Sequence, residues 1–142
     1  MIKNGKQDKD MREVPEITDV FVPTAVLVIE ANGKRCYASL EDNSAEKAFV
    51  EKLRGEVTFD MRDGGFCKIG HFTCRLPQND EEMTVKPGDI VLCGEDKLMI
   101  CYDESRGIFT KIASQSYVSK EKLLDILGEG DVSVKLFLEW SE

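Results

Sequence analysis

The alternation of apolar and polar positions predicts a chain built mainly of β-strands. Residues 24–31 form an apolar, largely β-branched run, and Asn32-Gly33 follows it. This dipeptide is favoured in two-residue type I′ hairpin turns. Residues 34–40 then alternate between apolar and polar side chains, as expected of a strand with one buried face. The two segments predict a β-hairpin.

A short helix is predicted directly after this hairpin. Asn43 can serve as its N-cap, and Glu46, three residues later, completes the pattern of a capping box. Apolar residues then recur at helical spacing until Gly55, where the pattern ends. The segment between Asn43 and Gly55 therefore predicts one amphipathic helix.

A second hairpin is predicted from the strand that follows. Val57, Phe59 and Met61 alternate with polar neighbours, so we expect these three side chains to fill the interior and their neighbours to face solvent. Residues 63–65 read Asp-Gly-Gly, a turn sequence, and a new strand is expected to begin near Phe66.

The second half of the chain predicts further strands and one more helix. The expected segments are a polar loop over 78–83, a Pro87-Gly88 turn, strands over 90–93 and 98–102, and a loop over 103–107 leading to Ile108. A helix is then indicated by Ser119 at the cap, by Val118 and Leu123 as a hydrophobic staple, and by Gly128 at its end. The last strand is expected to point Val132, Val134, Leu136 and Leu138 inward.

Length and composition fit one domain with one core. The chain has 142 residues, of which 42% are hydrophobic, and contains no stretch that divides it into two cores. Residues 1–20 are charged and lack apolar periodicity, so we expect a flexible arm there and a barrel domain over 21–142.

Net charge narrows the expected partners and location. A formal charge of -8 repels phosphate backbones and anionic headgroups, so we expect no nucleic-acid partner and no membrane partner. The chain has no apolar run long enough for a membrane helix and no apolar core of a secretory signal. We therefore expect a cytoplasmic protein. The sequence leaves its oligomeric state open.

The cysteines are expected to be buried, reduced thiols. There are five of them, with no CxxC pair among them. Cys67, His71 and Cys74 have a spacing that could supply zinc ligands, but the sequence offers no obvious fourth ligand. We therefore expect neither a metal nor a cofactor.

Four short segments carry a resemblance to a known family. They are Leu40-Glu41-Asp42-Asn43, Lys86-Pro87-Gly88-Asp89-Ile90, the strand that ends in Tyr102, and Leu127-Gly128-Glu129-Gly130-Asp131-Val132. Together with the order of the elements, they resemble the cyclophilin-like domain family of small bacterial proteins. The resemblance implies a mostly-β fold, a small closed or nearly closed barrel with two short helices covering its ends. Members of this family are, as a group, of undetermined function.

The leading functional hypothesis is a non-enzymatic binding module. If Met61 points inward, Arg62 points outward, and the aromatic residues Phe66, Tyr102 and Phe109 are candidates for the walls of a groove around it. An arginine beside aromatic rings suits a small molecule or an extended peptide that carries a carboxylate.

Two alternatives remain open. Cyclophilins catalyse prolyl isomerisation with an outward arginine, and the resemblance makes Arg62 the candidate, although it stands one position later after Phe59 than in the cyclophilin Phe-His-Arg signature. The other alternative is a structural or assembly role through the N-terminal arm.

Overall fold

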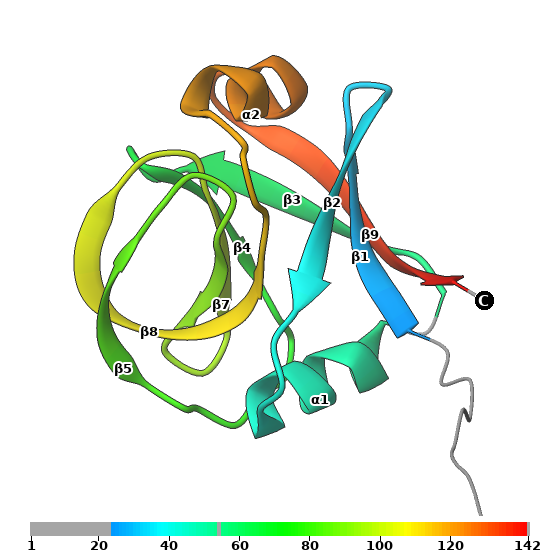
Figure 1. Ribbon diagram of the computed structural model, residues 1–142, viewed down its shortest axis with the longest axis vertical. Helices are drawn as coiled ribbons and strands as arrows, with labels where there is room; N and C mark the ends of the chain where they lie inside the picture. Colours follow the sequence, from blue (N-terminus) through cyan, green and yellow to red (C-terminus); the bar gives the residue numbers. More distant parts are fainter. Residues whose placement is uncertain (1–23, 54, 142) are drawn as a thin grey trace, which may run out of the picture.

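The computed structural model describes residues 24–53 and 55–141, which form a mostly-β structure (Figure 1). The predicted arm over residues 1–20 lies outside this part of the chain. In order, the elements are β1 (Thr24–Ala31), β2 (Lys34–Leu40), α1 (Ser44–Lys52), β3 (Val57–Asp63), β4 (Cys67–His71), β5 (Glu81–Val85), β6 (Ile90–Cys93), β7 (Lys97–Cys101), β8 (Ser105–Ser114), α2 (Lys120–Leu127) and β9 (Val132–Ser141).

The strands form one antiparallel sheet that closes on itself. Their order is β2-β1-β9-β3-β4-β7-β6-β8-β5, and a further pairing between β2 and β8 joins the two ends of the ring. Within the described chain, β5 pairs with β8 alone and therefore lies outside the ring. The predicted barrel, closed or nearly closed, is confirmed, and closure leaves few strand edges exposed.

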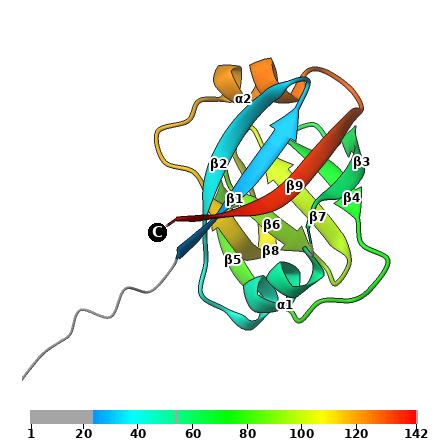
Figure 2. The same ribbon diagram turned by 90° about the vertical axis from the view of Figure 1, so that its right-hand side faces the viewer.

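The two helices lie at opposite ends of the ring (Figures 1 and 2). Both begin at the predicted caps: the side chain of Asn43 accepts a hydrogen bond from the Glu46 amide at 2.7 Å, and that of Ser119 accepts one from the Lys122 amide at 3.1 Å. Gly128, with a φ of 76°, ends α2 in the left-handed region that favours glycine. Neither described helix is long and apolar enough to cross a membrane.

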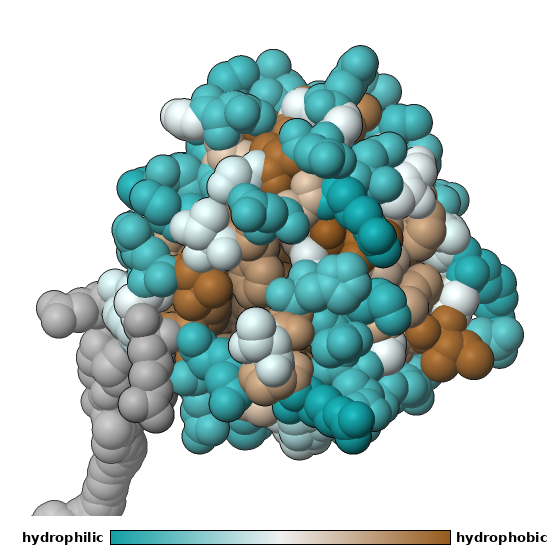
Figure 3. Space-filling view, turned by 180° about the vertical axis from the view of Figure 1, so that it is seen from behind, coloured by the Kyte–Doolittle hydropathy of each residue, from teal (hydrophilic) through white to brown (hydrophobic). Residues whose placement is uncertain are grey.

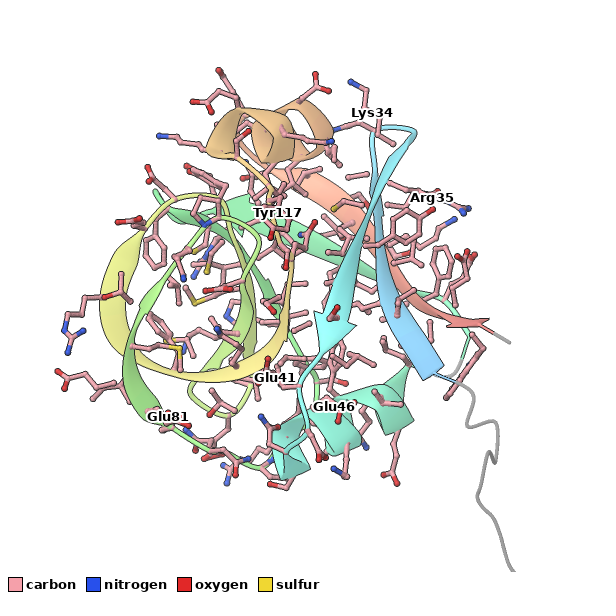
Figure 4. All side chains as sticks on the ribbon, in the orientation of Figure 1. Lys34, Arg35, Glu41, Glu46, Glu81 and Tyr117 are labelled. Carbon is pink, nitrogen blue, oxygen red and sulfur yellow. The ribbon has the colours of Figure 1, made fainter. Side chains whose placement is uncertain are left out.

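The first hairpin is anchored to α2 at its tip. Asn32 and Gly33 both have positive φ, 54° and 76°, as a type I′ turn requires. The side-chain amide of Asn32 donates a hydrogen bond to the Ile126 carbonyl at 2.9 Å, and Lys34 forms an ion pair with Asp125 at 2.9 Å. Figure 4 shows Lys34 at this tip, beside the helix.

The main core fills the ring, as the alternation predicts. Phe59 and Met61 are buried there and Val57 packs against them half-buried, so the inward trio of β3 is confirmed. On the neighbouring strand β9, Val134 and Leu136 are fully buried. Burial of such side chains is the main term that favours folding.

A second, smaller core lies on the outer side of β4, β7 and β6. Its buried members are Cys67, Val85, Val91, Met99, Cys101 and Phe109. Two of them come from β5 and β8, which curve away from the rest of the ring and form the lobe that Figure 1 shows in green and yellow. We call this set the outer cluster.

Two predicted loops are wrong in part. The segment over 78–83 was expected to be a loop, but β5 begins within it at Glu81, and the expected loop over 103–107 gives way to β8 from Ser105. Strands β5 and β8 pair with each other, and this distant pairing supplies the strand structure that the polar sequences of the two loops do not predict. Charged residues such as Glu81, which points outward in Figure 4, also suit an edge strand.

Candidate functional site

Strands β3 and β4 pair over a very short stretch. Only Arg62 with Ile69 and Asp63 with Lys68 are paired, whereas β3 pairs with β9 over residues 57–61. Beyond Arg62 and Ile69 the two strands diverge, and the ladder between them stops. Close to this point, Gly70 on β4 packs against Met61 on β3. A Cβ added to the glycine would be 3.2 Å from the Met61 Cγ, so side chains of β3 fill the space between the diverging strands on the inner side of the barrel.

Two cavities of about 460 and 410 Å³ follow the divergence. Asp60 and His71 line both of them, so the cavities form one continuous depression along β3 and β4. We call it the β3–β4 groove. Its lining consists of Lys52, Leu53, Val57, Thr58, Phe59, Asp60, Met61, Arg62, Ile69, His71, Phe72, Thr73, Cys74, Asp131, Val132 and Ser133. The view from behind shows apolar surface interspersed among polar side chains on the face opposite Figure 1 (Figure 3).

The groove contains an arginine without an acidic partner. Arg62 is exposed, and no carboxylate of the described residues lies within salt-bridge distance of its guanidinium. Three other arginines of the described chain are paired, Arg35 with Glu30, Arg75 with Glu95, and Arg106 with Glu82. A guanidinium free of an internal partner can form a two-point hydrogen bond with the carboxylate of a ligand.

Of the four residues predicted to form a site, Arg62 alone lines this groove, and the other three face elsewhere. Phe66 and Phe109 come together in the outer cluster, with ring centroids 6.5 Å apart. Tyr102, 6% exposed, points into the barrel, and its hydroxyl donates a hydrogen bond to Asp63 at 2.6 Å. Arg62 lines the groove with Ile69, which also packs against the outer cluster.

Lys68 is fully buried, although its charge predicts a solvent-facing side chain. Its ammonium group donates a hydrogen bond to the Gly130 carbonyl at 2.6 Å, lies 3.6 Å from the Asp63 carboxylate and faces the Tyr102 ring at 5.7 Å. The alternation carries part of the signal, because Asp63 is in phase with Met61 and Phe59. That Lys68 is paired with Asp63, and so shares its inward face, is known only from the structure.

These contacts change the proton affinity of both acidic partners. The hydrogen bond from Tyr102, with Lys68 nearby, lowers the pKa of Asp63. Burial, with the adjacent Asp63, raises the pKa of Tyr102 to about 12. Tyr102 therefore stays protonated at neutral pH and holds Asp63 from the inside, next to Arg62 on the outside.

The three residues whose spacing could supply zinc ligands, Cys67, His71 and Cys74, lie in different surroundings. Cys67 is buried in the outer cluster, Cys74 packs against the main core, and His71 is exposed in the groove. Among the residues that the structure describes, no three His, Cys, Asp or Glu side chains are grouped so as to hold a metal ion.

A closed antiparallel ring with a helix at each end and an external groove defines a class of small β-barrel proteins. The chain belongs to the Cyclophilin-like family, whose model matches residues 29–137, more than half of its length. No curated protein and no solved structure matches the chain significantly.

Proposed function

We propose that this chain is a non-enzymatic binding module that holds a small molecule or an extended peptide in the β3–β4 groove. The single observation that carries the proposal is the position of Arg62, an unpaired cation in a groove that follows two diverging strands. A carboxylate on the ligand would supply the acidic partner that the described chain does not provide.

The shape of the groove favours an elongated ligand. The larger cavity begins at Lys52 near the end of α1, and the smaller one ends at Asp131 beyond Arg62. Apolar side chains such as Phe72 and Ile69 line it between the charged groups. A ligand with an apolar body and one terminal carboxylate fits this distribution, because apolar walls supply affinity while few polar groups fix orientation.

Paired peptides provide a direct test. We would titrate the protein with N-acetylated tripeptides that carry one apolar or aromatic side chain, each made with a free C-terminal carboxylate and as the C-terminal amide, and record backbone NMR shifts. We expect the free acids to bind, with shift changes concentrated at Arg62, Ile69 and His71. Amidation should weaken binding about tenfold or more, since a charged hydrogen bond contributes about 1.5–3 kcal/mol.

Two arginine variants control this experiment. Arg62→Gln should reduce the affinity for the free acid to that for the amide, whereas Arg35→Gln, at a paired arginine that does not line the groove, should leave it unchanged. Equal affinity of acid and amide, or equal loss in both variants, would refute a carboxylate site at Arg62.

Prolyl isomerisation is a second candidate, favoured by one observation. Arg62 is exposed on the outer side of β3, and an outward arginine is what the resemblance to cyclophilins implies for catalysis. A protease-coupled assay on a short proline peptide tests it. Catalysis should be lost in Arg62→Gln and kept in Arg35→Gln, and a rate equal to that in buffer would exclude it.

An assembly role through the N-terminal arm rests on the sequence alone, because residues 1–20 lie outside the described chain. Deleting them and measuring the mass in solution tests this role. An unchanged oligomeric state would count against it.

A further inference from the structure

Two cysteines stand directly opposite each other on neighbouring strands. Cys67 on β4 pairs with Cys101 on β7 in the antiparallel register, and both are fully buried in the outer cluster. Side chains of directly opposed residues project from the same face of a sheet. The two thiols therefore lie side by side beneath the lobe formed by β5 and β8.

The hydrogen bonds show which kind of pair this is. Cys101 directs both of its backbone groups toward β6: its amide donates to the Asp89 carbonyl at 2.8 Å and its carbonyl accepts from the Gly88 amide at 2.9 Å. The Cys67 carbonyl accepts from Gly64 at 2.8 Å, on the side away from β7. Cys67 and Cys101 thus form a non-hydrogen-bonded pair.

Non-hydrogen-bonded pairs bring side chains closest. Their Cα atoms lie about 4.5 Å apart, and disulfides span Cα separations of about 4.4–6.8 Å. The backbone therefore meets the distance requirement of a disulfide without changing its register. The neighbouring bond from the Tyr102 amide to the Phe66 carbonyl, at 2.9 Å, fixes that register one residue away.

We propose that Cys67 and Cys101 form a reversible cross-strand disulfide when the protein meets a hydroperoxide. In the first step, one thiolate attacks the peroxide, forms an S–O bond to give a sulfenic acid and releases hydroxide, which takes up a proton as water. The second thiolate then attacks the sulfenic sulfur, the S–S bond forms, and a second hydroxide leaves as water. Two thiols are oxidised and one hydrogen peroxide is reduced.

The other three cysteines lack this arrangement. Cys36 lies in the main core on β2, and Cys93 is opposite Lys97 in the β6–β7 register. Cys74 packs against the main core rather than the outer cluster. The structure therefore favours one specific pair among the five cysteines of the chain.

Burial makes the reaction slow and sensitive to pH. Burial raises the pKa of Cys67 to about 12 and raises that of Cys101 as well. Because the thiolate is the nucleophile, the rate of disulfide formation should rise about tenfold for each pH unit as long as the pH is below the pKa of both thiols.

Mass spectrometry of the native protein tests the proposal. We would expose the wild-type chain to hydrogen peroxide, remove the peroxide with catalase, block free thiols with iodoacetamide as the protein is denatured, and digest it without reductant. The expected product is a linked peptide pair that contains Cys67 and Cys101, with loss of alkylation at both positions together. Dithiothreitol should restore both thiols.

Two comparisons make the result specific. Protein oxidised in concentrated urea should give a mixture of pairings, and Cys36→Ala should form the native linkage as the wild type does. The proposal would be overturned if peroxide oxidised Cys74 or Cys93 while Cys67 and Cys101 both remained free thiols and were alkylated. A mixture of pairings in the native protein, like that in urea, would also overturn it.

Discussion

Two seams of the same barrel differ in how completely their strands pair. Between β1 and β9, residues Thr24–Glu30 are paired in seven consecutive positions, whereas β3 and β4 pair at two. The first seam is a continuous wall. The second opens into the β3–β4 groove.

An arginine side chain lies on the outer side at each seam: Arg35 reaches over the first seam from β2, and Arg62 lies on β3 at the second. Arg35 forms an ion pair with Glu30 at 2.7 Å and lies over the Phe137 ring at 5.2 Å from its centroid. Val28, which is paired with Phe137, is fully buried although it is not part of the main core. Arg62 has no such partner in the described chain.

The comparison shows how backbone pairing decides the role of a side chain. Where the ladder is complete, neighbouring strands supply partners at fixed positions, and the arginine becomes part of the wall. Where the ladder stops, the next strand moves away and the arginine stays available to a ligand. Four predictions sharpen this contrast, ordered from the largest expected effect on stability to the smallest.

Phe59→Ala should be the most damaging change at the open seam. The ring is 6% exposed and meets Phe72 edge to face, with centroids 5.1 Å apart, so it separates the core from the groove. We expect the free energy of unfolding to fall by about 3–5 kcal/mol, as measured by urea denaturation followed by circular dichroism. Exposed Thr58, changed to alanine, is the control and should stay within about 0.5 kcal/mol of wild type.

Gly70→Ala tests how tightly the divergence is packed. A Cβ at this position would lie 3.2 Å from Met61 and 3.3 Å from Phe59, which is tighter than normal contact. Overpacking of this kind should cost about 1–3 kcal/mol in the same denaturation experiment. An unchanged midpoint would mean that Met61 moves aside freely and that the seam is loosely packed.

Tyr102→Phe removes the hydrogen bond to Asp63. The free energy of unfolding should fall by about 1 kcal/mol at pH 7, and the loss is small because Asp63 is partly exposed to solvent. The lowered pKa of Asp63 means that its contribution is present above about pH 4 and is lost as the pH falls through the folded-state pKa. Tyr102 has its pKa raised to about 12, so its contribution is present below about pH 10 and is lost toward pH 12.

The stability difference between Tyr102→Phe and wild type should therefore narrow at both extremes of pH. Thermal unfolding of the two proteins across this range measures it. A difference that stays constant at acid and alkaline pH would show that the hydroxyl stabilises the fold without its charge-dependent contact to Asp63.

The two arginines should give the smallest effects and separate the seams most directly. Arg35→Ala removes an ion pair and the side chain that lies over the Phe137 ring, so the melting temperature should fall by a small but measurable amount. Arg62→Ala should leave it unchanged, because no described residue depends on that guanidinium. The reverse order, measured by differential scanning calorimetry, would contradict the assignment of Arg62 to ligand binding.

Local patterns predicted most of the elements because each depends on neighbouring residues. Asn32-Gly33 places the hairpin turn, Asn43 and Ser119 cap the helices, and the alternation in β3 places Phe59 and Met61 inside. The same alternation predicted that Arg62 faces outward, which the structure shows.

The candidate site was only partly predictable. Tyr102 was expected on the outer wall, but whether a residue in an entirely apolar strand faces in or out depends on the neighbouring strands, and its side chain packs in the main core. Phe66 lies just before β4 and Phe109 lies on β8, so these residues are distant in sequence and only the tertiary structure brings their rings together. Lys68 was missed because a lysine in a strand is expected to face water.

The sequence by itself determined the type and order of most elements, the caps of both helices, the first hairpin turn and the inward face of β3. Only the tertiary structure decided which strands became neighbours and where pairing stopped, and with them the position of β5, the burial of Lys68 and the groove beside Arg62. The physical reason is that a period of two records which side of a strand is apolar, whereas the partner of each edge depends on contacts between residues far apart in the chain.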